Sequence, residues 1–501
     1  MSAEPITIVI AGGGTAGWMT AAALGHFLEH GYHVRLVESD AIGTVGVGEA
    51  TIPQIRLFNQ ALGLDEDAFL RATQGTFKLG IEFDGWRRPG ARYMHAFGDV
   101  GRDVGLIAFQ HYWLRARTLG LAAGLDAYSL NEIAASAGRM HRGAPLTGAA
   151  IPAMPYAFHF DAGLYAAWLR RFAERRGVAR TEGAIATVAR DGESGDVTAL
   201  VLESGERIAG DLFVDCTGFR GLLIGETLGT GYEDWSRWLP CDRALAMPTE
   251  AVAAPIPYTR ATARKAGWQW RIPLQHRTGN GHVYASAFTS DDEAAAILHA
   301  NVEGRPLGEP RPLRFVTGRR RAAWVRNVVA IGLSSGFLEP LESTSIHLVQ
   351  SAISRLLKLL PGRGRSEALA REYNRQTDAE IEAIRDFLIL HYHANERDEP
   401  FWQAMRATPL PGSLAGRIAL YRETGQIVRD GEELFTEVAW LQVFEGQGVT
   451  GSRYHPLADG IAPADLKEFM ETIGALYRRE AARYPGHAET IARHCAARPA
   501  P

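Results

Sequence analysis

The stretch ITIVIAGGGTAGWMTAAALGHFLEHGYHVRLVE, residues 6–38, decides the fold. It begins with an apolar run at residues 6–11, which suits a buried strand. An alanine-rich stretch of helical character follows, and a second short apolar run ends on Glu38. This order predicts a β-α-β unit that opens an α/β domain.

The turn between the first strand and the helix carries glycines in G-x-G-x-x-G spacing, at Gly12, Gly14 and Gly17. The first glycine allows a tight turn, the second lets a pyrophosphate approach the backbone, and the third lets helix and strand pack closely. The helix start at Thr15 and Ala16 offers free N–H groups to phosphates. Glu38 suits ribose hydroxyls and would repel a 2′-phosphate. We predict FAD or NAD rather than NADP; a structural glycine turn is the alternative.

Three further segments are expected near this nucleotide: the loop after Glu38, the strand end at Asp215 and the turn after residues 328–331. The loop after Glu38 is rich in glycine and small residues, and a short apolar run at 328–331 precedes another glycine. We expect the following positions to approach the cofactor: Gly46, Gly48, Glu49, Ala50, Asp215 and Gly332. A flexible connector and an ordinary strand turn are the alternatives.

The chain has 501 residues, 46% of them hydrophobic, which is enough for a large core and more than one domain. We expect a nucleotide-binding module with a β-meander and inserted substrate-covering segments at 1–360. A mostly helical region at 361–501 would complete a substrate site. The net charge of -4 and the lack of a basic stripe argue against a nucleic-acid partner.

Cysteine and histidine usage excludes several classes of site. Cys216, Cys241 and Cys495 form no C-x-x-C pair, so we predict neither a zinc site nor a disulfide framework. His391 and His393 lie two apart on a predicted helix and make a poor metal pair. The N-terminus lacks the features of a signal peptide, and no apolar run has membrane-spanning length. We expect a soluble, cytoplasmic protein without a metal, either a monomer or a homodimer.

Two segments carry candidate chemistry. The sequence EPLESTS at 339–345 stands at the start of a predicted helix, where free N–H groups favour an anion, although serine and threonine there are usually caps. Because the loop follows the strand at 328–331, a bound anion would lie near the cofactor. Lys78 lies on a predicted strand at 76–83; an apolar setting would lower its pKa, but the residues alone favour a solvated edge lysine.

The chain also contains a pair of closely spaced tryptophans and a second glycine motif. Trp268 and Trp270 lie two apart and share a face of a predicted hairpin centred on 278–281, where they are usually part of a core. A second G-x-G-x-x-G, at 446–451, is followed by no predicted helix and is rejected as a nucleotide site. The chain therefore offers no separate NAD(P)H fingerprint if its dinucleotide is FAD.

Five motifs resemble those of the flavin-dependent tryptophan halogenase family, from the N-terminus to about residue 460. They are GGGTAGWM at 12–19, DLFVDCTGFRGLL at 211–223, WQWRIP at 268–273, FLEPLEST at 337–344 and DFLILHYHANERDEPFW at 386–402. The resemblance is closest in character to indole-brominating members. It implies an FAD-monooxygenase-like Rossmann-type module in which FADH2, O2 and halide give hypohalous acid, which reaches a separate substrate chamber through a tunnel.

The resemblance also implies roles for individual residues. Lys78 would hydrogen-bond the hypohalous acid or form a haloamine, Glu342 would orient the electrophile or remove the ring proton, and Ser343 would hydrogen-bond near the pair. The halide would bind the backbone N–H groups of Thr344 and Ser345. The substrate chamber would include Trp268, Trp270, Pro273 and Trp440. A separate NAD(P)H flavin reductase would supply FADH2.

Departures from the family pattern limit the substrate. Residues 428–440, VRDGEELFTEVAW, lack the paired tyrosines of the free-tryptophan enzymes, so the amino-acid clamp is expected to be missing. We therefore expect a small aromatic substrate such as indole. Ser345 replaces the glycine of many relatives, and bromide and chloride both stay open. An FAD aromatic hydroxylase and a non-catalytic flavoprotein are the alternative functions.

Overall fold

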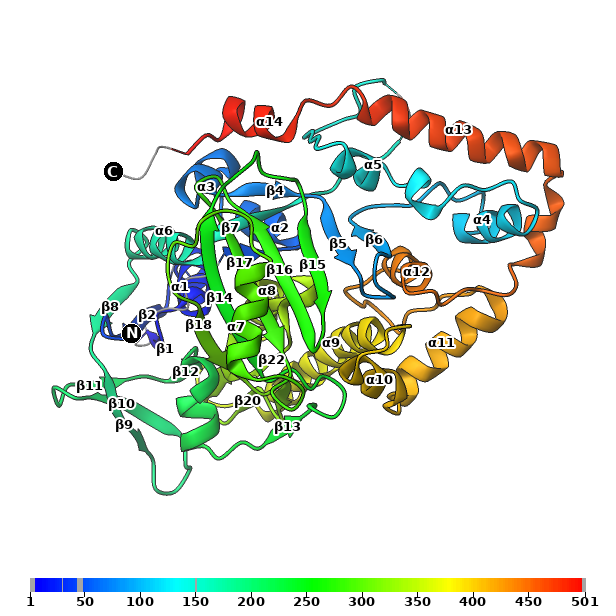
Figure 1. Ribbon diagram of the computed structural model, residues 1–501. Coiled ribbons are helices and arrows are strands. Elements are labelled where there is room, and N and C mark those ends of the chain that lie inside the picture. The colour runs from blue at the N-terminus through cyan, green and yellow to red at the C-terminus, as the bar shows by residue number, and fades with distance from the viewer. Residues whose placement is uncertain (1–4, 29, 43–47, 149–150, 498–501) are drawn as a thin grey trace.

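The fold is described from a computed structural model that covers residues 5–28, 30–42, 48–148 and 151–497. Its parallel sheet, its large mixed sheet and its C-terminal helices lie side by side (Figure 1). The predicted α/β class is confirmed, while the division at residue 360 stays a prediction.

A six-stranded sheet carries the predicted β-α-β unit. Its strands, in spatial order, are β20 (Trp324–Val325), β21 (Val328–Ala330), β12 (Leu212–Asp215), β1 (Ile6–Ala11), β2 (Tyr32–Glu38) and β8 (Ala179–Glu182). All neighbours are parallel except β20 and β21. The helices α6 (Ala162–Glu174) and α8 (Ser345–Lys358) both pack against α1 (Thr15–Phe27) beside it. The apolar runs of β1, β12 and β21 at the centre of this sheet are almost entirely buried, as expected for parallel strands covered on both faces.

The predicted β-meander forms a separate antiparallel sheet of β9 (Ile185–Arg190), β10 (Val197–Leu202) and β11 (Arg207–Ala209). A second small antiparallel sheet joins β13 (Tyr232–Asp234), β19 (Gly318–Arg320) and β22 (Gly336–Phe337). The meander extends from the body of the molecule at the lower left of Figure 1.

A seven-stranded sheet forms the centre of the molecule. Its order is β18 (Arg311–Arg314), β14 (Arg243–Glu250), β17 (Arg277–Tyr284), β16 (Gly267–Pro273), β15 (Thr259–Arg264), β5 (Gly80–Asp84) and β6 (Arg92–Ala96), with α7 (Asp291–Ala300) against β17. The predicted hairpin exists, but its turn lies at 274–276, and the predicted position was wrong. The glycine at 281 serves packing instead: a Cβ there would lie 2.0 Å from the Trp270 ring.

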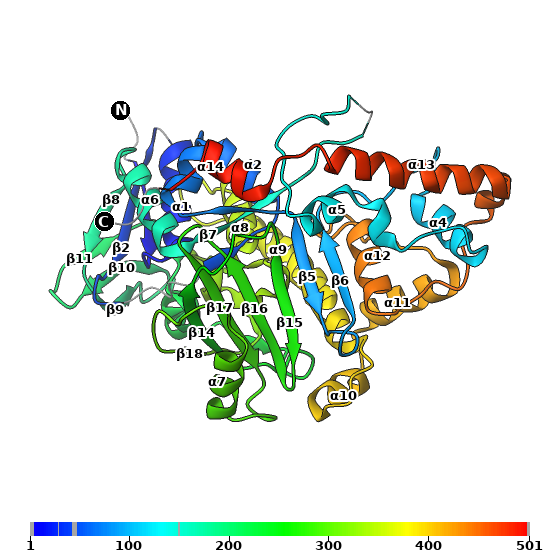
Figure 2. The same ribbon diagram turned by 45° about the horizontal axis from the view of Figure 1, so that its top comes forward.

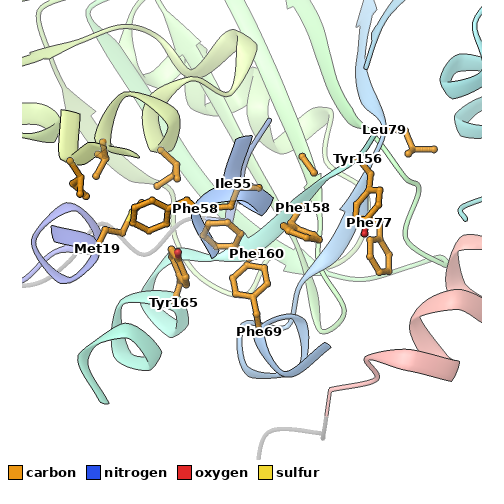
Figure 3. Packing of buried hydrophobic residues seen from close by; sticks show 14 of the residues in the cluster. Met19, Ile55, Phe58, Phe69, Phe77, Leu79, Tyr156, Phe158, Phe160 and Tyr165 are labelled. Carbon is orange, nitrogen blue, oxygen red and sulfur yellow. The ribbon is translucent and has the colours of Figure 1, made fainter. Parts of the chain in front are cut away.

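The predicted strand at 76–83 is divided between two sheets. Its first part, β4 (Thr76–Lys78), joins β3 (Gly48–Ala50) and β7 (Ala157–Asp161), and its second part is β5. In Figure 3 the Phe77 side chain lies with Tyr156 and Phe158 in the apolar core below this sheet. The chain before β4 forms two helices, α2 (Gln54–Ala61) and α3 (Glu66–Ala72).

Helices dominate the C-terminal third, as predicted. They are α9 (Glu367–His393), α10 (Pro400–Ala407), α11 (Gly412–Thr424), α12 (Glu437–Gly446), α13 (Pro463–Ala481) and α14 (His487–His494). The helix α13 packs on α4 (Phe109–Thr118) and α5 (Leu130–Ser136), which lie far from it in the sequence (Figure 2). The rejected second glycine motif leaves α12 and enters coil. Within the described residues, no helix is both long and apolar enough to cross a bilayer.

Candidate functional site

Several of the predicted nucleotide-binding positions lie at one edge of the parallel sheet. They follow the carboxyl ends of four strands: Gly12 and Gly14 after β1, Glu38 at the end of β2, Asp215 at the end of β12, and Gly332 beyond β21. Parallel strands place these ends together, and open α/β sheets bind their ligands there. Gly46 lies outside the described residues.

The start of α1 fits a dinucleotide. Gly14 precedes the helix without any side-chain cap, and a Cβ built on it would meet nothing within 4 Å. The N–H groups of Thr15 and Ala16 therefore stand at an open helix start, where a pyrophosphate binds. Gly12 has φ +105°, and a Cβ there would lie 2.4 Å from the Cys216 carbonyl oxygen, so only glycine fits the turn. A Cβ on Gly17 would lie 1.9 Å from the Gly12 carbonyl oxygen, so this position also requires glycine.

Two acidic residues at this edge have different surroundings. Glu38 accepts hydrogen bonds from Trp18 Nε1 at 3.2 Å and Arg180 Nε at 2.5 Å, which fix its carboxylate beside the turn. The buried Asp215 carboxylate accepts four hydrogen bonds from its own loop, from the Thr217 amide and hydroxyl and from two later backbone N–H groups. Asp215 therefore holds the turn after β12, and its predicted approach to a cofactor stays a prediction.

The glycine-rich loop returns to the core at β3, which pairs with β7. Gly48 starts this strand and packs against Ile272, whose Cγ2 would lie 3.4 Å from a Cβ at Gly48. Burial raises the pKa of the next residue, Glu49, to about 7. Ala50 pairs with His159 in the strand.

The predicted anion site lies at the start of α8. Thr344 is buried and precedes the helix, and its hydroxyl has no hydrogen-bond partner among the described residues. The first N–H groups of a helix have no partner within it, so those at Thr344 and Ser345 face the segment before the helix. Ser343 has φ +59°, a left-handed conformation that turns the chain into the helix. Gly332 lies close to both α1 and α8, since a Cβ there would meet Ala16 and Val349.

Lys78 is fully buried, so the interpretation as a solvated edge lysine was wrong. Its Nζ donates to Ser343 Oγ at 2.8 Å and to the Thr51 carbonyl oxygen at 2.9 Å. The alternation of apolar and polar residues at 76–83 predicts a single strand with Lys78 on its polar face. The structure divides this segment between two sheets, and β4, which carries Lys78, lies in the smaller one with β3 and β7. Burial lowers the pKa of Lys78 to about 7, although the nearby Glu342 carboxylate opposes the shift.

Glu342 is held between two histidines that the sequence did not indicate as site residues. His95 Nδ1, from β6, lies 2.8 Å from one carboxylate oxygen, and His391 Nε2, from α9, lies 2.9 Å from the other. All three side chains are buried. Burial alone would raise the pKa of Glu342, but the two imidazoles outweigh it and lower this pKa to about 2. The carboxylate is therefore ionised near neutral pH.

A pocket with a cavity volume of about 120 Å³ opens beside this cluster. It is lined by Ile52, Pro53, Gln54, His95, Ala96, Phe97, Gly98, Glu342, Leu434, Phe435, Thr436, Ala439 and Gln442. Lys78 lies behind one wall, with Nζ 5.3 Å from the centre of the Phe97 ring. The Gln442 amide exchanges two hydrogen bonds with the Ala96 backbone and so attaches α12 to β6.

None of the four predicted chamber residues is among those that line this pocket. Trp268 and Trp270 lie buried in the seven-stranded sheet, where Trp268 Nε1 donates to Glu339 at 3.0 Å. Pro273 accepts a hydrogen bond from Thr76 through its carbonyl. Trp440 lies behind the pocket and packs edge-on against Phe387, which stacks on the lining residue Phe435.

The family model described as tryptophan halogenase matches residues 7–463. The chain belongs to the tryptophan halogenase family. It is 36% identical to the tryptophan 6-halogenase SttH of Streptomyces toxytricini over 93% of this chain and 94% of that protein. It is also 37% identical to the tryptophan 7-halogenase RebH of Lentzea aerocolonigenes over 84% and 83%.

Solved structures of flavin-dependent halogenases share the fold of this family member. Xcc4156 from Xanthomonas campestris has a TM-score of 0.96 at 51% identity, with 100% of both chains covered. BrvH from Brevundimonas sp. BAL3 has a TM-score of 0.94 at 48% identity, covering 98% of this chain and 99% of that one. This tryptophan halogenase family member is therefore an oxidoreductase, and the predicted family, fold and enzyme class are confirmed.

Proposed function

We propose that this enzyme halogenates indole or a similar electron-rich aromatic, with FADH2, O2 and bromide or chloride as co-substrates. Bound FADH2 would supply the reducing power that turns halide and O2 into a hypohalous acid. The open start of α1, at Gly14, Thr15 and Ala16, would hold the pyrophosphate, and the start of α8, at Thr344 and Ser345, would hold the halide.

The observation that carries this proposal is the buried group formed by Lys78, Ser343 and Glu342 beside the pocket. A lysine with a pKa of about 7 has a substantial neutral fraction near neutral pH, and its lone pair can accept a halogen. Ser343 Oγ fixes the position of its Nζ. The ionised Glu342 would stabilise positive charge on the attacked ring and then accept the ring proton.

The pocket suits a neutral aromatic better than an amino acid. Among the described lining residues, the only ionisable side chains are His95 and Glu342, which already pair with each other. The arginines at the segment that replaces the clamp are also paired: Arg417 donates to both oxygens of Glu433, and Arg429 pairs with Glu437. Among the described residues of the pocket lining and of this segment, a free amino acid would therefore find no unpaired cation for its carboxylate.

A separate NAD(P)H flavin reductase would supply FADH2. The support is that the second glycine motif runs from α12 into coil, which offers no helix start to a second dinucleotide.

The test is mass spectrometry of the products formed from indole with FAD, a flavin reductase, NADH and bromide. We expect monobrominated indole, with much less product from free tryptophan. Lys78→Met should abolish bromination while flavin oxidation continues, because the lysine acts after the oxidant has formed. Lys265→Met is the matched control, since Lys265 is exposed and pairs with Glu293 on the surface.

Two results would contradict the proposal. Bromination that survives in Lys78→Met would remove the role of the lysine. An oxygenated indole formed without halide would identify an FAD aromatic hydroxylase instead.

A further inference from the structure

The strand that carries Lys78 is short and has a strand partner on one side only. β4 pairs with β7, and its other edge faces the segment at 255–257. That segment leads into β15, which is parallel to β5 with Ile81 opposite Thr259. In the same register, the Leu79 amide donates to the Pro257 carbonyl at 2.7 Å. The next pair back along the chain would be Phe77 and Pro255.

A histidine from the C-terminal helix occupies the position of that next bond. The Phe77 N–H donates to His487 Nε2 at 3.1 Å, and His487 Nδ1 lies 2.7 Å from the Pro255 carbonyl oxygen. A carbonyl only accepts and an amide N–H only donates, so Nδ1 carries the proton and Nε2 presents its lone pair. The imidazole therefore joins β4 to the segment at 255–257 at the position where the register would place a direct backbone bond.

The imidazole is suited to stay in this neutral form. His487 is 1% exposed and packs edge-on against the Phe77 ring, with 6.0 Å between ring centres. Burial lowers the pKa of His487 to about 4. At neutral pH it therefore keeps both its donor and its acceptor.

Other contacts attach α14, so the His487 side chain is not needed to hold the helix. The His487 amide donates to Gly138 O at 2.8 Å, and the Met140 amide donates to Pro485 O at 3.1 Å. Thr490 Oγ1 donates to Met140 O at 3.2 Å. The side chain can therefore be changed while the helix stays in place.

We propose that His487 is a positioning residue for Lys78, acting through the backbone of β4. Phe77 directly precedes the lysine, so a displaced Phe77 amide moves the lysine backbone as well. Lys78 Nζ must reach both Ser343 Oγ and Thr51 O, and a shift of the strand would break this geometry. The inference rests on the proposed role of Lys78. It also assigns a function to a residue beyond 463, where the family match ends.

The experiment compares His487→Met with the nearly isosteric His487→Gln, in the full chain. Gln keeps an acceptor for Phe77 N–H and a donor for Pro255 O, whereas Met keeps only the volume. Thr490→Val is the control that weakens the attachment of α14 without touching β4. Lys78→Met is measured alongside. The readouts are halogenated product per flavin oxidised, kcat and KM, and hydrogen–deuterium exchange of the peptide at 74–80.

We expect His487→Met to lower halogenation kcat between about 10- and 100-fold with little change in KM or flavin oxidation. Exchange at 74–80 should become faster. His487→Gln should restore most of the activity and protection, and Thr490→Val should behave like the unmodified enzyme. Equal losses of halogenation activity in His487→Met and His487→Gln would overturn the inference. Equal losses of this activity in His487→Met and Thr490→Val would overturn it as well. If Lys78→Met still halogenates, the role of the lysine fails, while the exchange result still tests the bridge.

Discussion

At the scale of single residues, the charge on Glu342 determines what it can do. A carboxylate with a pKa of about 2 is a weak base near neutral pH, so its main contribution would be a fixed negative charge beside the reacting ring. That charge depends on the two imidazoles, since burial acts in the opposite direction. His95 is therefore expected to act through Glu342 as well as lining the pocket.

A variant of His95 tests this dependence. We expect His95→Leu to lower halogenation about tenfold, because Glu342 loses the imidazole that is hydrogen-bonded to it while it stays buried. Its pKa should rise, so the acid limb of the kcat profile should move to higher pH. His95→Asn is the matched control, because its amide can still donate near the position of Nδ1. A profile of His95→Leu that superimposes on that of the unmodified enzyme would contradict the argument.

At the scale of elements, the spacing of β5 and β6 positions His95. Gly80 starts β5 opposite Ala96, and a Cβ on it would lie 2.7 Å from the His95 carbonyl oxygen and 2.8 Å from Ala96 Cα. Both contacts are with backbone, which cannot rotate away. A side chain at this position must therefore push the two strands apart.

We expect Gly80→Ala to lower the free energy of unfolding by about 1 to 3 kcal/mol and to reduce halogenation, because β6 carries His95 away from Glu342. Denaturant unfolding and product formation measure the two effects. Gly416→Ala, on an exposed position of α11 with nothing within 4 Å, is the control and should be neutral or stabilising. Unchanged stability and activity in Gly80→Ala would contradict the proposed constraint.

The sequence predicted those elements whose signal is local. The glycine turn at Gly12, the mostly helical region at 361–501 and the buried strand at 328–331 each follow from a local sequence pattern. The burial of Lys78 was missed because a single residue, Leu79, transfers the chain between two sheets. His95, His391 and His487 were missed because each acts on a residue more than 40 positions away, and no local pattern marks such a contact.

At the scale of the whole molecule, Glu339 lies where the central sheet meets the C-terminal helices. Its carboxylate is fully buried and accepts hydrogen bonds from Trp268 of β16 and Tyr392 of α9. One of its oxygens has no hydrogen-bond partner among the described residues. Burial raises the pKa of Glu339 to about 7, so the folded protein favours the neutral acid.

This shift predicts a pH-dependent cost in stability. Between the unfolded pKa of about 4.5 and the folded pKa of about 7, the folded state binds more protons than the unfolded state. The contribution of Glu339 to the free energy of unfolding is therefore fully present below pH 4.5 and is lost as the pH rises through 7.

Glu339→Gln keeps an acceptor for Trp268 and Tyr392 but cannot ionise. Its free energy of unfolding relative to the unmodified enzyme should rise by about 2 to 3 kcal/mol between pH 4.5 and 8. Denaturant unfolding across this range measures the change, and a difference that is independent of pH would show that Glu339 does not ionise at the junction.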